Sequence, residues 1–277
     1  MLDVDQFWRE GFLVIPKVFD PHTVLGWRKT ALKRENRLAD LLTDDKLRGV
    51  VLNEKMVEFA RQILGAPPIY FGDSTASISI GPSLWGFHKD NSDRLDQKAP
   101  DWKTDRYPLI RFGVYCQSHG KQPGGVEFRR GSHLQPDYTS GERYAPPTEP
   151  GDVIVWNSRT THSGNSRIVR GLGLRMMPDP YSVAFRAVAR LKAEWLFKSL
   201  NQERVALFFS YGRADPLLDR HMQYLKNRAY PWEMWKASCW TDETKSLAAR
   251  VGLGLIDPKE FQHDGSALAK NYAPIPY

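Results

Sequence analysis

Residues 85–91 read Trp-Gly-Phe-His-Lys-Asp-Asn, and residues 156–165 read Trp-Asn-Ser-Arg-Thr-Thr-His-Ser-Gly-Asn. In an extended strand, side chains two residues apart lie on the same face, so His88 and Asp90 can bind one ion together and His162 can complete the set. Two imidazoles and one carboxylate on one face are the ligand set of non-heme Fe(II) oxygenases, which leaves positions open for an organic acid and dioxygen. The three residues therefore predict a catalytic iron site.

A His-x-Asp sequence alone occurs often by chance in surface loops, so the prediction of a metal site depends on the residues around it. Residues 150–152 (Pro-Gly-Asp) predict a turn, and the apolar run 153–156 predicts a short buried strand that ends just before His162. A second strand is predicted for residues 170–177, with Arg170 at its start. An enzyme that uses a 2-oxo acid needs a cation for the far carboxylate, and a planar guanidinium suits a carboxylate better than lysine does.

Three arginines compete for that carboxylate: Arg167, Arg170 and Arg175. Arg170 shares a predicted strand face with Leu172 and two further apolar residues, whereas Arg175 lies on the opposite face. An arginine at the head of an apolar face is costly unless an anion meets it. Arg170 is therefore the predicted carboxylate anchor, Arg175 is predicted to be an outer residue, and Arg167 is predicted to lie in an exposed loop.

Five segments follow one another between about residues 5 and 178. They are residues 7–19 (Phe-Trp-Arg-Glu-Gly-Phe-Leu-Val-Ile-Pro-Lys-Val-Phe), the His88/Asp90 pair, residues 124–133 (Gly-Gly-Val-Glu-Phe-Arg-Arg-Gly-Ser-His), residues 150–152, and His162 with Arg170. In this order they resemble the phytanoyl-CoA dioxygenase family of Fe(II)/2-oxoglutarate oxygenases.

The resemblance implies a jelly-roll core of the double-stranded β-helix type. It also implies iron on His88, Asp90 and His162, and 2-oxoglutarate anchored by Arg170, with dioxygen as oxidant and ascorbate as a stimulant. It does not imply a phytanoyl substrate, because the family also acts on natural products and osmolytes.

Two positions depart from the family pattern. Arg130 stands where the family usually has a proline before Gly-Ser-His, which indicates an altered turn, and the interval from His162 to Arg170 is short for the family. His133 is a rival metal ligand by residue type, but the family's histidine at this place is structural.

The predicted fold class is mainly β with flanking α: a jelly-roll (cupin-like) core with N-terminal helices and a C-terminal helical extension. The whole chain, 1–277, is predicted to be one domain, with its core at about 5–178 and the extension at about 179–277. Helix-like spacing occurs at 3–10, 21–42 and 54–64, and strands dominate from about 69 to 178. Beyond the core, three helices are predicted at 183–197, 201–211 and 215–228. Three roles are open for this extension: it braces the core, covers the mouth of the site or forms a dimer interface. Bracing of the core is the default expectation.

Two further regions are predicted to contribute to the site. In the strand at 69–80, Asp73, Thr75 and Ser77 share one polar face, which meets either bulk water or a polar pocket. The family resemblance favours the pocket, with Thr75 as a cofactor contact and Asp73 and Ser77 as substrate contacts. Trp102 lies in a long polar loop after Asp90 and is predicted either to close over a substrate or to pin the loop to the surface.

The composition narrows the class of protein. With only two cysteines among 277 residues, no disulfide framework is expected, and a reducing, cytoplasmic location is the better prediction. No apolar stretch approaches the roughly 20 residues of a membrane span, and the N-terminus does not read as a secretory signal. The net charge of +7 is spread among acidic residues, so it indicates a solvated surface or an anionic small substrate rather than a nucleic-acid partner. A monomer or a homodimer is expected.

The predicted reaction is oxidative decarboxylation of 2-oxoglutarate to succinate and carbon dioxide, coupled to hydroxylation of an aliphatic carbon of a small molecule. Demethylation, desaturation or ring formation are other outcomes of the same chemistry. Asp90 argues against a halogenase, because halogen-transferring relatives replace this carboxylate with a small residue. Two alternatives stay open: a non-catalytic metal-binding jelly-roll module, and a cupin-like enzyme that does not use 2-oxoglutarate.

Overall fold

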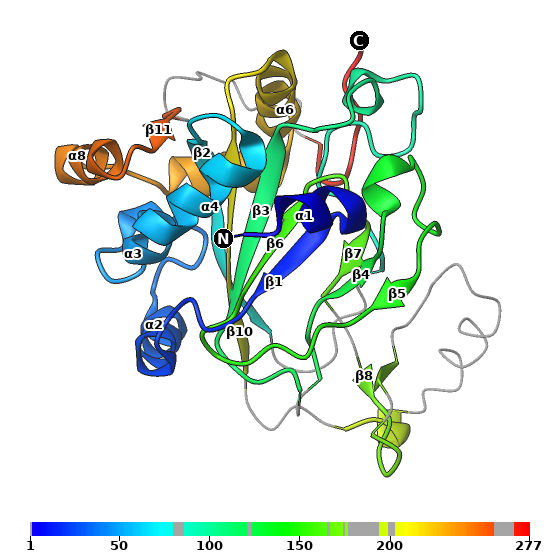
Figure 1. Ribbon diagram of the computed structural model, residues 1–277. Helices are drawn as coiled ribbons and strands as arrows, with labels where there is room; N and C mark the ends of the chain where they lie inside the picture. Colours follow the sequence, from blue (N-terminus) through cyan, green and yellow to red (C-terminus); the bar gives the residue numbers. More distant parts are fainter. Residues whose placement is uncertain are drawn as a thin grey trace.

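A computed structural model describes residues 2–79, 86–120, 123–164, 167–173, 175–176, 194–198, 203–257 and 269–277. Its largest element is a six-stranded sheet in the order β1-β6-β3-β10-β2-β11 (Figure 1). Neighbouring strands are antiparallel, except that β11 runs parallel to β2. The strands are β1 (Phe12–Ile15), β2 (Ile69–Ser79), β3 (Leu109–Tyr115), β6 (Val153–Asn157), β10 (Arg204–Gly212) and β11 (Gly254–Leu255).

A second sheet faces the first and completes the jelly roll, which confirms the predicted fold class. It has the order β5-β4-β7, with β4 (Glu127–Arg129), β5 (Arg143–Tyr144) and β7 (His162–Ser163). Aromatic and aliphatic side chains fill the space between the two sheets: Phe12, Tyr115, Val126, Phe128, Ile154 and Trp156. A separate hairpin is formed by β8 (Arg167–Ile168) and β9 (Arg175–Met176).

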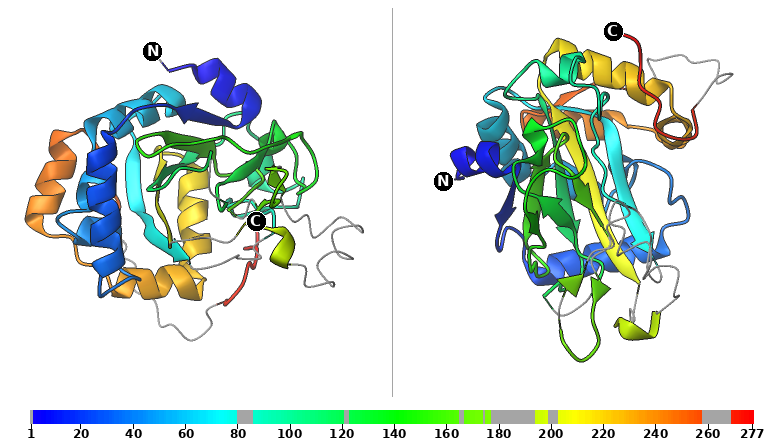
Figure 2. Two further views of the ribbon diagram at one scale, coloured as in Figure 1. Left: turned by 90° about the horizontal axis from the view of Figure 1, so that it is seen from below. Right: turned by 90° about the vertical axis from the view of Figure 1, so that its right-hand side faces the viewer.

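Helices cover the opposite face of the large sheet. Figure 1 places α2, α3, α4 and α8 on one side of this sheet and β4, β5 and β7 on the other, and the view from below in Figure 2 agrees. Their apolar side chains form one core with Phe112, Val155 and Leu207 of the sheet. The helices are α1 (Val4–Glu10), α2 (Pro21–Lys33), α3 (Arg48–Val51), α4 (Glu54–Leu64), α6 (Pro216–Lys226), α7 (Ala229–Lys236) and α8 (Asp242–Arg250), with short 3₁₀ turns at Leu41–Thr43, Pro100–Trp102, Ser132–Leu134 and Glu194–Leu196.

Strand β10 contradicts two predictions made from the sequence. Residues 201–211 were expected to form a helix, but residues 204–212 form a central strand that pairs with both β2 and β3. The prediction of a core that ends near residue 178 is therefore also wrong, because β10 completes the sheet. Both faces of β10 are buried, so its sequence lacks the polar–apolar alternation that marks a half-exposed strand.

Two of the other predicted helices are confirmed, and one is shorter than predicted. The helices at 54–64 and 215–228 are confirmed as α4 and α6, and Asp20 caps α2 as its side chain accepts from the backbone N–H of His22 at 2.9 Å. The predicted helix at 21–42 ends earlier, at Lys33. The predicted helix at 183–197 lies largely outside the described residues.

The part of the C-terminal extension that is described braces the core. Leu218 and Met222 of α6 and Trp235 of α7 pack in one apolar cluster with Phe71 and Tyr107. Arg220 of α6 binds both carboxylate oxygens of Asp93, which lies in the loop after Asp90, at 2.9 and 3.0 Å. None of the helices in the described ranges is long and apolar enough to cross a lipid bilayer.

Candidate metal centre

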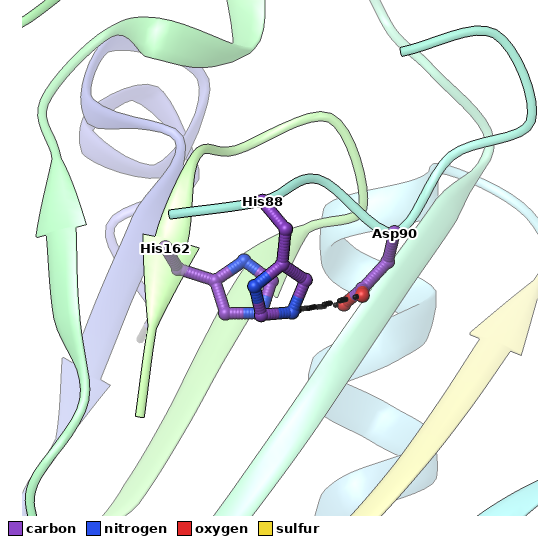
Figure 3. Close-up of side chains that lie close together, drawn as sticks. All are labelled: His88, Asp90 and His162. Atoms are coloured by element: carbon purple, nitrogen blue, oxygen red, sulfur yellow. Dashed lines mark ion pairs between the residues drawn. The ribbon is translucent and has the colours of Figure 1, made fainter. Parts of the chain in front are cut away.

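Backbone pairing brings the three predicted metal ligands together (Figure 3). His88 and His162 exchange two backbone hydrogen bonds of 2.9 Å, and the N–H of Asp90 donates to the carbonyl oxygen of Ser158 at 2.8 Å. The extended backbone turns His88 and Asp90 to one face, while Lys89 points away and donates to the carbonyl oxygen of Ser132 at 2.7 Å. The predicted i, i+2 geometry is thus present.

The ligand atoms of the three side chains face one another. Nε2 of His88 lies 3.7 Å from Oδ1 of Asp90, and Nε2 of His162 lies 3.4 Å from Oδ2. One ligand atom from each residue lies within 4.8 Å of the others. Oδ2 of Asp90 is buried and accepts no hydrogen bond from the described residues. A buried carboxylate oxygen without a donor is costly unless a cation meets it, so the donor set fits a divalent metal ion.

Hydrogen bonds orient both imidazoles toward this point. Nδ1 of His162 lies 2.9 Å from the carbonyl oxygen of Thr160, and Nδ1 of His88 lies 3.2 Å from that of Gly86. A carbonyl oxygen can only accept, so Nδ1 carries the proton in each ring and Nε2 keeps its lone pair. Both rings therefore present the metal-binding nitrogen to Asp90.

The protonation states agree with metal binding. Burial lowers the pKa of His162 to about 3 and also lowers the pKa of His88, so both rings are neutral near pH 7. Burial acts to raise the pKa of Asp90, but the neighbouring imidazoles and the Arg111 guanidinium outweigh it and hold this pKa below its usual range. Neutral imidazole and ionised carboxylate are the forms that bind a metal ion.

A cavity of about 300 Å³ opens beside the three ligands. Apolar side chains of both sheets form part of its wall, and two arginines and two serines add polar groups. Besides the three ligands, the lining residues are Ser77, Ile78, Ser79, Arg111, Tyr115, Val126, Trp156, Gly164, Arg204 and Phe208.

Arg204, at the start of β10, is the cavity residue best suited to bind a carboxylate. The residue is 7% exposed, Nη1 donates to the carbonyl oxygen of Gly164 at 2.6 Å, and Nε is buried and finds no hydrogen-bond partner in the part of the chain that the structure describes. Burial lowers the pKa of Arg204, with Tyr115 partly offsetting it, and no carboxylate forms an ion pair with it in the described ranges. A buried guanidinium with a spare donor and no counterion fits an anionic ligand.

Arg170, the anchor predicted from the sequence, lies elsewhere. Residues 170–172 form a turn rather than a strand, the Arg170 side chain is exposed, and its Nη2 donates weakly to the carbonyl oxygen of Phe197 at 3.4 Å. Leu172, predicted to face the core, is 71% exposed. The strand register drawn through Arg170 is therefore wrong, because residues 170–172 form a turn and, of the described part of the predicted strand, only residues 175–176 pair with a neighbouring strand.

The polar face of β2 is only partly at the cavity. Ser77 lines it, as does Ser79 further along the strand. Asp73 instead forms an ion pair with Arg111 at 2.7 Å at the inner end of this face. Thr75 lies between Asp73 and Ser77 on the same face by strand alternation, and it is paired with Phe208 of β10.

Trp102 and His133 both have structural surroundings. The indole N–H of Trp102 donates to the carbonyl oxygen of Asp93, and its ring packs under the cations of Lys89 and Arg159 at 5.3 and 5.2 Å. This arrangement supports the alternative in which Trp102 pins the loop. The imidazole of His133 is fully buried, with Nε2 2.9 Å from the carbonyl oxygen of Trp8, so it holds the N-terminal segment to the core.

Comparison with known proteins identifies the fold. No family model matches the chain, and no curated protein matches it. HygX from Streptomyces hygroscopicus, solved with nickel and 2-oxoglutarate, is 17% identical over 77% of this chain and 88% of its own, with a TM-score of 0.54. The non-heme, α-ketoglutarate-dependent epimerase SnoN from nogalamycin biosynthesis is 17% identical over 76% of this chain and 82% of its own, with a TM-score of 0.52.

A third solved structure extends the range of reactions on this fold. The α-ketoglutarate-dependent carbocyclase SnoK from nogalamycin biosynthesis is 17% identical over 76% of this chain and 83% of its own, with a TM-score of 0.50. At such identities the likeness is one of fold. The chain has the jelly-roll fold seen in non-heme iron and 2-oxoglutarate-dependent enzymes, and the phytanoyl-CoA dioxygenase family is not singled out among them.

Proposed function

We propose that the protein is a non-heme Fe(II)/2-oxoglutarate-dependent oxygenase that oxidises an aliphatic carbon of a small molecule, with hydroxylation as the leading outcome. One observation carries the proposal: His88, Asp90 and His162 face one another in a cavity that also holds the buried Arg204, which has no carboxylate partner among the described residues. The fold shared with HygX, SnoN and SnoK supports it.

Each residue has a definite task in this proposal. His88 and His162 would hold the iron through Nε2 and Asp90 through a carboxylate oxygen, and Arg204 takes over from Arg170 as the partner of the far carboxylate of 2-oxoglutarate. Thr75 and Ser77 stay predicted contacts of the co-substrate and the substrate. Bound iron supplies dioxygen activation, with oxidative decarboxylation of 2-oxoglutarate to succinate and carbon dioxide.

The lining of the cavity favours an uncharged substrate. Arg111 is already paired with Asp73, so Arg204 is the one lining cation in the described ranges that lacks a carboxylate partner, and 2-oxoglutarate would use it. HygX has been solved with hygromycin B and SnoN with nogalamycin RO, which supports a small organic molecule for this chain as well. Epimerisation and ring closure, as named for SnoN and SnoK, are the second candidate outcomes.

One assay separates this proposal from the two alternatives. The purified protein is incubated with Fe(II), ascorbate and 2-oxoglutarate, and succinate is measured without added substrate. We expect slow release by the parent protein and none by Asp90→Ala or His162→Ala, while His22→Ala, at an exposed position of α2, keeps the parent rate. A metal-binding module or a cupin-like enzyme without a 2-oxo acid would release no succinate while still binding the metal.

A further inference from the structure

Two half-buried arginines outside the cavity, Arg94 and Arg228, lie against the same tyrosine, Tyr224 of α6. Arg94 lies in the loop that follows Asp90, and Arg228 lies between α6 and α7. Nη2 of Arg94 donates to the hydroxyl oxygen of Tyr224 at 3.2 Å. The guanidinium carbon of Arg228 lies 5.2 Å from the centroid of the Tyr224 ring. Two segments that are far apart in the sequence thus bring two positive charges to one side chain.

The described residues do not neutralise these two guanidinium groups. Among them, no carboxylate forms an ion pair with Arg94 or Arg228, and Nε of each is buried without a hydrogen-bond partner. Tyr224 is fully buried, and its hydroxyl group, which accepts from Arg94, keeps its own proton for a further acceptor. Buried donors without an acceptor cost free energy. An anion that received hydrogen bonds from both arginines and from the tyrosine would remove this cost.

The two arginines and Tyr224 lie beside the metal centre. Burial raises the pKa of Tyr224, the charges of Arg94 and Arg228 act to lower it, and the charge of Asp90 acts to raise it. Both guanidinium groups and the predicted metal ligand therefore lie close to the Tyr224 hydroxyl group. Neither Arg94 nor Arg228 is among the described residues that line the cavity of about 300 Å³. An anion held here would lie near the metal position but outside that cavity, apart from the co-substrate at Arg204.

We propose that Arg94, Arg228 and the hydroxyl group of Tyr224 bind an anionic group of the substrate, a carboxylate or a phosphate. The uncharged part of the same molecule would enter the cavity, whose lining favours such a part, and present the carbon that is oxidised. A substrate held at a second point beside the metal is oriented before the reaction, which favours oxidation at one carbon. The inference rests on the proposed function for the role of the anion, but binding of the anion itself requires no metal.

Inorganic phosphate is the probe for the first test. It is titrated by calorimetry into the metal-free full chain that carries Arg204→Met, because this substitution removes the cavity arginine assigned to 2-oxoglutarate. Arg94→Met and Arg228→Met, each added singly, should weaken phosphate binding about tenfold or more, since each removes a charge-assisted hydrogen-bond donor. Tyr224→Phe should weaken it severalfold while the ring beside Arg228 remains. Arg106→Met is the matched control and should change nothing, because Arg106 is an exposed arginine that packs over a tryptophan ring at 5.6 Å.

The second test measures whether the bound anion lies near the metal. The same protein is loaded with Co(II), and the relaxation rate of the phosphate ³¹P nucleus is measured, because a paramagnetic ion speeds the relaxation only of nuclei close to it. We expect faster relaxation that is lost in Arg228→Met at unchanged Co(II) affinity. Acetate added in competition then separates the two kinds of anion. Displacement of phosphate by acetate at similar concentrations supports a carboxylate group on the substrate, and retention of phosphate supports a phosphate group.

The outcomes are distinct. Phosphate binding that is equal in Arg94→Met, Arg228→Met and the control would overturn the inference. If Arg94→Met does not fold, as its melting curve would show, Arg228→Met and Tyr224→Phe decide. Faster ³¹P relaxation that persists in Arg228→Met would also overturn it, since the phosphate would then bind to Co(II) itself, and so would relaxation that Co(II) leaves unchanged. A protein that binds phosphate through the two arginines but binds no Co(II) would instead refute the metal site of the proposed function.

Discussion

Replacing Arg204 by methionine should weaken 2-oxoglutarate binding and leave the metal site intact. Nη1 of Arg204 donates to the carbonyl oxygen of Gly164, but Nε is buried and has no hydrogen-bond partner among the described residues, so it can donate to a ligand. A hydrogen bond to a charged group contributes roughly 1.5–3 kcal/mol. Loss of one such bond therefore corresponds to about a ten- to hundredfold loss of affinity. Methionine keeps the aliphatic stem that packs against Gly124, so the fold should persist.

Calorimetric titration of 2-oxoglutarate into the Co(II)-loaded protein measures this affinity directly. Arg170→Met is the matched control, because Arg170 is exposed and its side chain only donates weakly to the carbonyl oxygen of Phe197. The parent and the control should agree within a fewfold. A large loss of affinity in Arg170→Met, with none in Arg204→Met, would refute the assignment and restore the anchor predicted from the sequence.

Three further predictions follow from the same structure. Gly164→Ala should raise the Michaelis constant for 2-oxoglutarate severalfold at unchanged Co(II) affinity, because the added Cβ would lie 3.1 Å from Nη2 of Arg204; an unchanged constant would contradict the close approach. Asp90→Ala should abolish metal binding and lower the melting temperature of the metal-free protein, since the carboxylate that Arg111 and the two imidazoles stabilise is lost; normal iron content in this variant would contradict the ligand assignment. Burial raises the pKa of Asp40 to about 6 from 3.8, so its contribution to stability is complete below about pH 4 and is lost as the pH rises through 6. Relative to Asp40→Asn, the parent should therefore lose about 3 kcal/mol of unfolding free energy between pH 4 and 7, as urea titrations at the two pH values would show, and a constant difference would argue against a carboxyl group whose pKa is raised by burial.

The grouping of the three candidate metal ligands was predictable because its signal is local. His88 and Asp90 are two residues apart, so strand alternation alone places them on one face. His162 follows a buried strand that ends at the same edge of the fold, and the structure pairs it with His88 directly. Signals of this kind can be read from a few neighbouring residues, whatever the length of chain between the two segments.

Arg204, the proposed carboxylate anchor, was missed because its signal depends on tertiary structure. Arg204 begins a strand whose two faces are both buried, and a continuous apolar run does not distinguish such a strand from a buried helix. Residues 201–211 were predicted to form a helix, and the three arginines compared for this role all lie nearer to His162 in the sequence. Arg111 did carry a signal, as a single charge within the apolar run 109–115, which indicates a buried ionic contact.

The place of β10 in the large sheet also bears on how the chain reaches its folded state. β10 lies between β2 and β3, and its pairing joins Gly212 to Ile69, more than a hundred residues earlier. Contacts between such distant segments close large loops and slow folding. Until residue 212 has left the ribosome, β2 and β3 each present an open edge to other chains, and unpaired edges promote aggregation. Chains cut before residue 204 should therefore collect as insoluble aggregates rather than as a smaller folded core.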